Sequence, residues 1–214
     1  MQDVLTPAQQ RCTVTVAPVV AELGFCLGGG LAIALRHGHR GSLDFDYFRT
    51  AAPGDPAATV QALRHKLPSV VPERTSPGSV SFVYEGVPVC LLDHDRPVLA
   101  PPETVPGFAA PVLSEVDLIA MKVLAVVNRG ARRDFIDLYV MAVASGLDAA
   151  GLLLPYVSRY AGDPYDAARA LCYFRDADRQ ADPRLLKPLD WSDVKSWFCS
   201  AVAAWAAGRG VKGS

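Results

Sequence analysis

Prolines are distributed unevenly along this chain of 214 residues, and their distribution constrains the fold more than any other feature. Thirteen of the 17 prolines lie at or before Pro111. Because proline lacks a backbone N–H and breaks helix interiors, we expect strands and loops in the first half and long helices in the second. The sequence therefore predicts a mixed α/β region over 1–112 and a helical region over 113–214.

Composition narrows the class of protein. Lys and Arg total 21 against 22 Asp and Glu, and this balance excludes a uniformly basic nucleic-acid coat, although a local basic patch is compatible with it. The five cysteines are scattered and never form a C-x-x-C pair, so neither a disulfide framework nor a zinc knuckle is predicted. The longest charge-free apolar stretch, 23–35, is shorter than the ~20 residues of a membrane span. We expect a cytoplasmic protein with no membrane partner.

Periodicity predicts the elements of the first half. A helix is expected over 7–23, a short strand over 25–27, and a helix that follows the glycines at 28–30 and ends near Gly38. Residues 79–92 are expected to form a hairpin, because a two-residue Glu-Gly turn joins two extended runs. In the second half, helices are predicted over 114–129, 133–145, 147–160, 164–174 and 191–207.

The most specific local feature is the alternating run at 41–48, which is expected to be a strand. Alternate side chains of a strand share a face, so Ser42, Asp44 and Asp46 are predicted to project together. The opposite face would carry Leu43, Phe45 and Tyr47. Two carboxylates so close repel each other unless a cation lies between them, and Mg²⁺ or Mn²⁺ sites use such oxygens. The alternative is an exposed edge strand whose acids are solvated.

Two further features fit a phosphate site. The glycines at 28–30 precede a helix, whose N–H groups and positive end can face a phosphate, although a tight packing turn is an equal alternative. Lys122 is the one charge in the apolar run 118–127, so its ammonium must either reach solvent along the protein surface or bind an anion.

Charged residues follow both features in the sequence. Asp134 and Asp137 lie three apart on one face of the predicted second helix, just after a group of arginines, which also suits ordinary helix-end electrostatics. Arg36, His37, His39 and Arg40 form a small basic cluster around Gly38. That cluster could bind a phosphate, but a solvated loop is the alternative.

Three blocks in order, LGGGLAIALRHGHRGSLDFDYF, EVDLIAMKVLAVVNRGARRDFIDLYVM and ALCYFRDADRQADPRLLKPLDWSDVKSWF, resemble the nucleotidyltransferase family of AbiEii/AbiGii-type abortive-infection toxins. The resemblance spans roughly residues 20–200. It implies an α/β (α+β) fold, with a minimal nucleotidyltransferase-like mixed sheet flanked by helices over 1–112. The helical region over 113–214 would complete the active-site cleft. The family consists mostly of toxins of bacterial toxin–antitoxin or phage-defence pairs.

The resemblance implies transfer of NMP from an NTP to an RNA, in some members a tRNA, or to a protein acceptor, with Mg²⁺ or Mn²⁺ as cofactor and a cognate antitoxin as partner. Residues carried over from the motifs divide into three roles. The metal ligands are Asp44 and Asp46, which also count as catalytic. The other catalytic residues are Lys122, Asp134 and Asp137. The nucleotide-binding residues are Gly29, Gly30, Arg40, Ser42 and Arg133.

The chain departs from the family pattern at two positions. Leu31 follows the glycines where a hydroxyl-bearing Thr or Ser is usual, and leucine cannot donate a hydrogen bond. The third carboxylate expected on a later strand is replaced by Cys90, with Asp93 and Asp95 just beyond. A catalytically weakened nucleotide- or partner-binding protein on the same fold is therefore the alternative. A metal-dependent phosphohydrolase is less favoured, because the sequence offers no His-Asp metal cluster.

Overall fold

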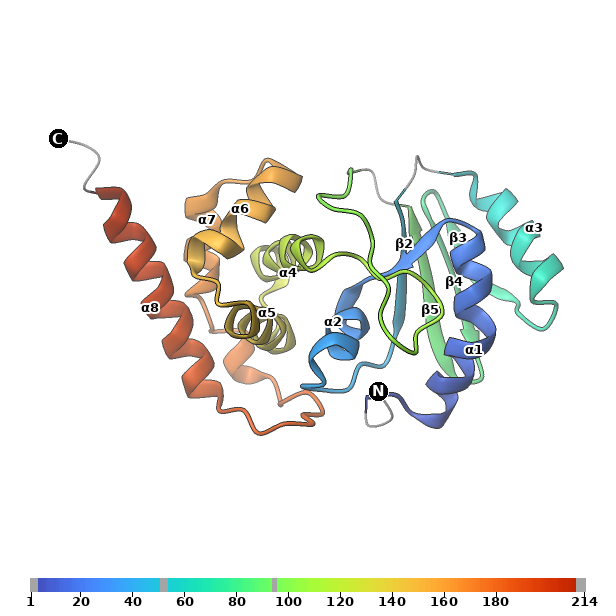
Figure 1. Cartoon of the computed structure of the whole chain (residues 1–214), viewed down its shortest axis with the longest axis horizontal. Helices are drawn as coiled ribbons and strands as arrows, with labels where there is room; N and C mark the ends of the chain where they lie inside the picture. The colour runs from blue at the N-terminus through green and yellow to red at the C-terminus, as the bar shows by residue number, and fades with distance from the viewer. Residues whose placement is uncertain (1–3, 51–53, 94–95, 211–214) are drawn as a thin grey trace. The chain divides into compact units, whose positions relative to one another are not determined.

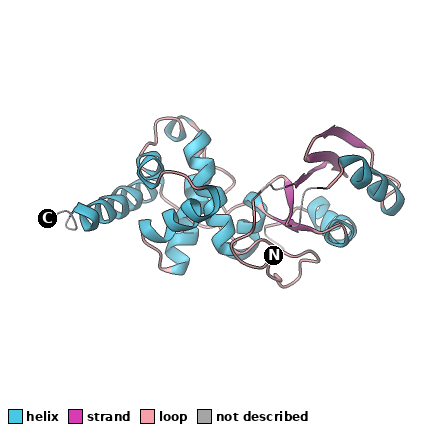
Figure 2. Cartoon of the chain, turned by 90° about the horizontal axis from the view of Figure 1, so that it is seen from above, coloured by secondary structure: helices cyan, strands magenta, loops and turns pink. Residues whose placement is uncertain are grey.

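The chain divides into two compact units, Met1–Ser114 and Glu115–Ser214, in a computed structural model that describes residues 4–50, 54–93 and 96–210. Among the described residues, every strand of the sheet belongs to the first unit and the second unit is helical, as Figure 2 shows by colour. The first unit comprises α1 (Pro7–Glu22), β1 (Phe25–Leu27), α2 (Gly29–His37), β2 (Phe45–Arg49), α3 (Pro56–Lys66), β3 (Pro72–Ser76), β4 (Ser79–Tyr84) and β5 (Val87–Asp93).

The first unit is built on a five-stranded mixed sheet in the order β1-β2-β5-β4-β3. β2 and β5 are parallel, whereas the other neighbouring strands pair antiparallel. α2 lies on one face of this sheet and α1 on the other (Figure 1). Phe45 and Tyr47 of β2, which pairs with the central strand β5, are fully buried and belong to the core of the unit. The expected fold, a mixed sheet flanked by helices, is confirmed.

Several predicted elements of the first unit are confirmed by the structure. α1, β1, α2 and the β4–β5 hairpin occupy the predicted ranges to within one or two residues. α1 begins at a capping box, in which the Thr6 side chain accepts from the Gln9 N–H and the Gln9 side chain accepts from the Thr6 N–H. α3 and β3 were not predicted. They carry little periodic apolar signal, since α3 buries Thr59 and Leu63 while β3 is largely exposed.

The predicted strand over 41–48 is partly wrong, because β2 begins only at Phe45. Leu43 is 78% exposed rather than part of the buried face. The reason is local: the Gln9 side-chain amide donates to the carbonyl oxygens of Ser42 (2.6 Å) and Leu43 (3.1 Å). This stretch is therefore bound to α1 rather than to a neighbouring strand. Ser42 and Asp44 lie in the loop before β2, and Asp46 lies within the strand.

The second unit confirms the five predicted helices, with shifts of a few residues at their ends. The helices are α4 (Glu115–Arg129), α5 (Arg132–Ser145), α6 (Ala149–Tyr160), α7 (Pro164–Leu171) and α8 (Trp191–Gly210), with a 3₁₀ turn η1 (Ala177–Arg179). α7 ends at Leu171 rather than at 174. Each predicted apolar stripe becomes a buried helix face, as expected when packing rather than propensity stabilises a helix.

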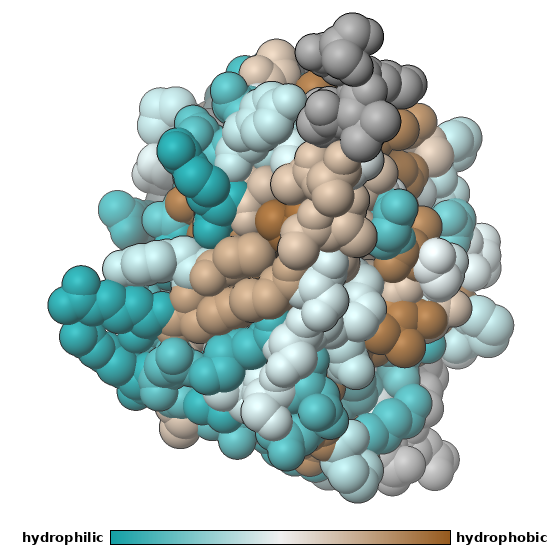
Figure 3. Space-filling view, turned by 90° about the vertical axis from the view of Figure 1, so that its left-hand side faces the viewer, coloured by the Kyte–Doolittle hydropathy of each residue, from teal (hydrophilic) through white to brown (hydrophobic). Residues whose placement is uncertain are grey.

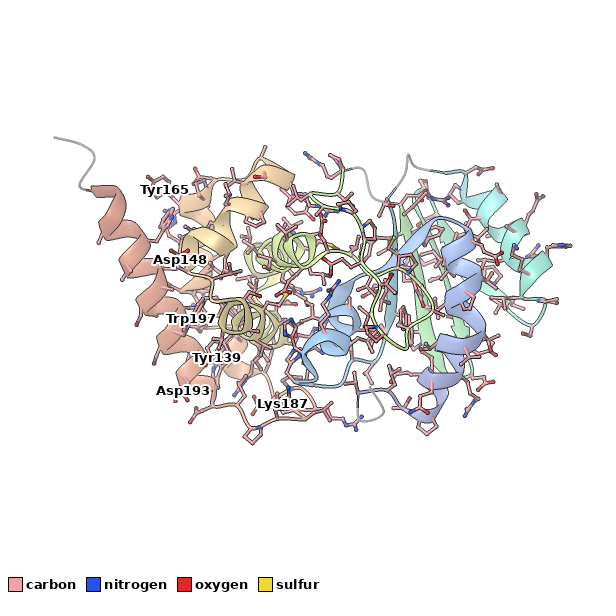
Figure 4. All side chains as sticks on the ribbon, viewed as in Figure 1. Tyr139, Asp148, Tyr165, Lys187, Asp193 and Trp197 are labelled. Carbon is pink, nitrogen blue, oxygen red and sulfur yellow. The ribbon has the colours of Figure 1, made fainter. Side chains whose placement is uncertain are left out.

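Phe135 of α5 is the centre of the aromatic core of the second unit. Its ring centroid lies 5.1 Å from that of Phe174, 5.9 Å from that of Trp191 and 5.6 Å from that of Phe198. These contacts fix α5 against α8, and Tyr139 and Trp197 extend the same packing (Figure 4). The outer side of α8 carries exposed alanines, and Figure 3 views this side with apolar atoms among polar ones. The core therefore holds Asp134, the neighbour of Phe135, in a rigid setting.

Within the part of the chain that the structure describes, no single helix is long and apolar enough to cross a membrane. α5 and α6 together satisfy the length and composition test, but they are bent by 115° at their junction.

Candidate active site

Asp46 and the start of α2 are in direct contact, and the glycines make this contact possible. The Gly28 N–H donates to the Asp46 carbonyl over 2.8 Å. A Cβ added to Gly29 would lie 2.6 Å from Asp46 Oδ2, and Gly29 has a φ of +64°. Any side chain here would be both strained and displaced by the carboxylate. The glycine loop is thus a close-approach turn that places the first N–H groups of α2 beside an acid of the predicted metal site.

Gly30, Arg40 and Ser42 also come together in this region. A Cβ on Gly30 would lie 2.5 Å from Arg40 Nη2 and 3.1 Å from Ser42 Oγ. Arg40 is only 3% exposed, and its Nη1 donates to the carbonyl of Gly41 over 2.8 Å. Leu31, in contrast, is fully buried in the core. Four residues predicted to bind nucleotide therefore lie together. Gly29 and Gly30 begin α2, and Arg40 and Ser42 lie beside Gly30.

The interpretation of residues 36–40 as a solvated loop is wrong. His39 and Arg40 are buried. The Arg36 guanidinium donates to Glu103 Oε2 over 2.6 Å and to the Leu113 carbonyl over 2.7 Å. These basic residues are held within the first unit because buried arginine donors require acceptors. Sequence spacing did not indicate this, since Glu103 and Leu113 lie far along the chain.

Cys90 occupies the position beside Asp46 on the neighbouring parallel strand. Burial raises the pKa of the Cys90 thiol, and the negative charges of Asp46 and Asp44 raise it further against an opposing hydrogen bond with Ser79. Both carboxylates thus lie close enough to act on the thiol. Asp44 precedes the strand by one residue and is exposed.

Asp93, the acid that follows Cys90 in the sequence, is engaged elsewhere. Its Oδ1 accepts from Arg49 Nε over 2.6 Å, and its Oδ2 accepts from the Gly54 N–H over 3.1 Å. It lies three positions beyond Cys90 on β5, opposite Arg49. Asp95 lies outside the described residues. Asp93 is therefore a structural ion-pair partner of Arg49.

The carboxylates of Asp44 and Asp46 fit a magnesium or manganese ion that is held partly by the phosphates of a substrate. Magnesium commonly binds through one or two carboxylates, with waters and substrate phosphates filling the other positions. Asp44 is exposed and Asp46 half-buried, so both carboxylates can be reached. Within the described ranges there is no group of three or more His, Cys, Asp or Glu side chains suited to a metal. The two carboxylates therefore suit an ion delivered with a nucleotide better than a closed structural site.

Lys122 does not extend to solvent, so the first of its two predicted alternatives is wrong. Its side chain is 8% exposed. Its Nζ lies 2.9 Å from Asp134 Oδ1 and 2.8 Å from Asp137 Oδ2, and both carboxylates are fully buried. The anions that it binds are two carboxylates from α5. The acids three residues apart therefore act as partners of this lysine, rather than serving only as helix-end charges.

Arg129 completes this buried cluster. Its guanidinium donates to both oxygens of Asp134, over 2.7 Å from Nε and 2.9 Å from Nη2. Burial alone would raise the pKa of the Asp134 carboxyl, but the hydrogen bonds and charges of Arg129 and Lys122 outweigh it, and the pKa is lowered. Asp134 is therefore held ionised. Arg133, the neighbouring predicted nucleotide-binding residue, is exposed on α5.

A second buried ion pair in the helical unit has no counterpart among the predictions. Arg159 of α6 donates to Asp117 of α4, and both side chains are almost fully buried. The two residues are 42 positions apart in the sequence, and their ion pair joins α4 to α6. In the sequence, the available signal was a charged residue on the apolar face of each helix.

The architecture and this geometry together define a nucleotidyltransferase-type protein: a mixed sheet with a Gly-Gly turn packed against a D-x-D strand, followed by a helical unit. The model of the AbiEii nucleotidyl transferase toxin family, of type IV toxin–antitoxin systems, matches residues 18–198. The chain belongs to this family, and the resemblance inferred from its motifs is confirmed. It is accordingly a nucleotidyltransferase of a toxin family.

Individual relatives agree with this assignment. An uncharacterized protein of Aquifex aeolicus, aq_aa25, is 28% identical over 184 residues, which cover 84% of this chain and 88% of that protein. MenT4, a nucleotidyltransferase toxin of Mycobacterium tuberculosis, shares the fold at a TM-score of 0.55 and 13% identity, over 91% of this chain and 81% of its own. JHP933 of Helicobacter pylori is similar at a TM-score of 0.56 and 15% identity, over 94% and 92%.

Proposed function

We propose that this protein transfers NMP from an NTP to an RNA acceptor such as a tRNA, in a reaction that requires Mg²⁺ or Mn²⁺. The observation that carries this proposal is the close approach of the Asp46 carboxylate to Gly29 at the start of α2, with Asp44 two residues before Asp46 and both acids acting on the Cys90 thiol. An acid pair next to a helix N-terminus suits a metal–triphosphate, since the cation pairs with the carboxylates and the phosphates with the N–H groups.

The residues around this pair have complementary roles in the proposal. Asp44 and Asp46 would hold the divalent ion, which supplies charge neutralisation at the phosphates when bound. The N–H groups at Gly29 and Gly30 and the hydroxyl of Ser42 would donate to phosphate oxygens. Arg40 would keep Ser42 and Gly30 in position, because it is buried against both. Leu31 supplies no hydroxyl, so phosphate binding would depend more heavily on the N–H groups of Gly29 and Gly30.

The transfer itself exchanges a phosphoanhydride bond of the NTP for a phosphoester bond to the acceptor. The acceptor hydroxyl oxygen forms a bond to the α-phosphorus as the bond to the bridging oxygen breaks. Diphosphate leaves, and the hydroxyl proton passes to water. The protein contributes mainly position and electrostatics to such a step, as is usual in phosphoryl and nucleotidyl transfer.

Lys122 is proposed to take part in the same reaction, with Asp134 and Asp137 as the residues that position it. An ammonium has three donors, and the two carboxylates fix the direction of the group. Arg133, exposed at the start of α5, is proposed to bind a nucleotide phosphate.

The experiment is an incubation of the purified protein with each labelled NTP, Mn²⁺ or Mg²⁺, and total tRNA or purified protein acceptors. We expect labelled RNA, and we expect Asp44→Ala and Asp46→Ala to abolish the label. Glu73→Ala, which removes an exposed acid of β3, is the matched control. Absence of transfer at high enzyme with every NTP and acceptor would overturn the proposal. Label on protein instead of RNA would show that the acceptor is a protein.

The alternative function is nucleotide or partner binding without efficient turnover. Buried Leu31 and the thiol at position 90 favour it, because the usual hydroxyl and third carboxylate are both missing. Calorimetry that shows tight NTP binding, together with a biological effect that survives Asp44→Ala, would identify this function.

A toxin role with a cognate antitoxin, in the cytoplasm, is the biological setting that we propose. Family membership supports this setting. Expression of the chain alone is expected to arrest growth, and expression of the gene immediately upstream is expected to relieve the arrest. Normal growth on expression of an active enzyme would contradict the toxin role but would leave the proposed nucleotide transfer unaffected.

A further inference from the structure

A small cleft opens at the C-terminal end of α4, and among its lining residues a role has been given above to Arg129. Its volume is about 160 Å³. The last four residues of α4 form one wall, and the other lining residues are Gly130, Ala170, Tyr173 and Asp176. Pockets for drug-sized ligands measure roughly 300–1,000 Å³. This cleft is therefore suited to a single planar ring system and is too small for a whole nucleotide.

The cleft lies at the negative, C-terminal end of the α4 dipole. The last four carbonyls of a helix lack partners within that helix, and all four residues that carry them in α4 line the cleft. The negative end of the helix dipole and the Asp176 carboxylate repel phosphate. The Arg129 guanidinium is shared with Asp134 and does not reverse this preference. The occupant should therefore present N–H donors rather than an anion.

An aromatic ring completes the site. Tyr173 is 54% exposed at the rim of the cleft, where an unstacked base can lie on its face. Asn128, also exposed, adds both a donor and an acceptor. Carboxylates accept from the exocyclic amine of cytosine, and amide side chains pair with adenine. A planar heterocycle that bears an exocyclic amino group fits the ring, the acceptors and the volume together.

We propose that this cleft binds a nucleobase with an exocyclic amino group, cytosine, adenine or guanine, with Tyr173 stacking on the base and Asp176 accepting from its amine. This inference rests on the proposed function, because the base would belong either to the NTP or to the RNA acceptor. The cleft is close to Lys122 within the helical unit: Asn128 follows it by six residues, about 9 Å along α4. A base held here belongs to a nucleotide near the Lys122 cluster.

The test compares Tyr173→Ala with Tyr165→Ala. Tyr165 is a second exposed tyrosine of the same region, but it packs on Trp205 at 5.3 Å between ring centroids and lies outside the cleft (Figure 4). Binding of short oligocytidylate, oligoadenylate and oligouridylate, and of CTP, ATP, GTP and UTP, is measured by calorimetry. We expect Tyr173→Ala to weaken the cytosine, adenine or guanine ligands at least tenfold, about 1.4 kcal/mol, and Tyr165→Ala to leave them within twofold. Asp176→Asn should reduce the preference over uracil.

The outcomes separate this inference from the proposed function. Tyr173-dependent binding without any nucleotide transfer would support the cleft and overturn the transferase proposal. Transfer with unchanged KM for NTP and acceptor in Tyr173→Ala, and unchanged binding, would overturn the cleft and leave the function standing. Uracil ligands that bind as tightly as cytosine, adenine and guanine ligands would overturn the amino-base assignment. A rise in KM for the NTP alone assigns the base to the nucleotide, and a rise for the RNA alone assigns it to the acceptor.

Discussion

Cys90 lies directly opposite Asp46 in the parallel pairing of β5 with β2. The negative charges of Asp46 and Asp44 both raise the pKa of the Cys90 thiol. A side chain at this position is therefore near the predicted metal ligands. The position is therefore the one on β5 from which a third carboxylate would act. Asp93, three residues further, is already bound to Arg49.

Cys90→Asp is expected to strengthen metal binding. Without metal, the third acid lowers the midpoint of thermal unfolding through like-charge repulsion. With Mn²⁺, the midpoint should rise further than it does in the natural protein, because ligand binding stabilises the folded state. Thermal unfolding with and without Mn²⁺ measures both effects, and Cys90→Ala controls for loss of the thiol. An equal Mn²⁺-induced rise in Cys90→Asp and the natural protein would contradict the prediction.

Gly29→Ala should abolish transfer through the contact with Asp46. The added Cβ would lie 2.6 Å from Asp46 Oδ2, and the left-handed backbone adds strain of about 1–2 kcal/mol. Gly146→Ala is the matched control, because it has a φ of +63° but nothing within 4 Å of the added atom. Both variants are expected to lose stability in chemical denaturation, and only Gly29→Ala is expected to lose activity. Full activity in Gly29→Ala would show that the close approach is not needed.

Lys122→Met should destabilise the helical unit by about 3–5 kcal/mol, because it leaves buried carboxylates without their cation. Asp134 keeps Arg129, whereas Asp137 loses its ammonium partner. The double variant Lys122→Met with Asp137→Leu removes both charges and should recover part of the stability, as urea denaturation would report. If Lys122 also takes part in transfer, the double variant stays inactive although it is folded. Restored activity in that variant would limit Lys122 to a structural role.

The lowered pKa of Asp134 predicts loss of stability in acid. Its folded-state pKa lies below the ordinary value of 3.8, so the unfolded chain takes up this proton first as the pH falls. The stabilisation is complete well above pH 3.8 and is lost as the pH falls through the folded-state pKa. Asp134→Asn should lower stability at neutral pH and flatten the acid limb of a stability–pH curve. Asp193→Asn, an exposed acid of α8 (Figure 4), is the control for removal of one charge. An unchanged acid limb in Asp134→Asn would contradict the assignment.

Asp117→Ala is expected to cost about 3–5 kcal/mol, because it leaves the Arg159 guanidinium buried and unpaired from its carboxylate. The double replacement Asp117→Leu with Arg159→Met removes both charges and should be markedly more stable than the single variant. Guanidinium denaturation of the three proteins decides this. Equal instability of single and double variants would mean that packing, rather than the buried charge, sets the cost.

The sequence by itself determined the helices of the second unit, the hairpin of β4 and β5, the Gly-Gly turn and the presence of a D-x-D motif. These features depend on local periodicity and turn chemistry, which are written in neighbouring residues. The family assignment also came from ordered motifs and needed no coordinates. The start of β2 at Phe45 could not be predicted in this way, since it depends on hydrogen bonds from Gln9 to the backbone at 42–43.

Only the tertiary structure decided which charges meet. From the sequence, Lys122 could have extended to solvent or bound an anion, and the packing of α5 decides this by placing Asp134 and Asp137 against it. Parallel pairing, rather than spacing along the chain, set Cys90 beside Asp46. The cleft under Tyr173 likewise joins segments more than forty residues apart in the sequence. The physical reason is the same in each case: a buried polar group takes its partner from whichever element packs beside it, and that choice is not local.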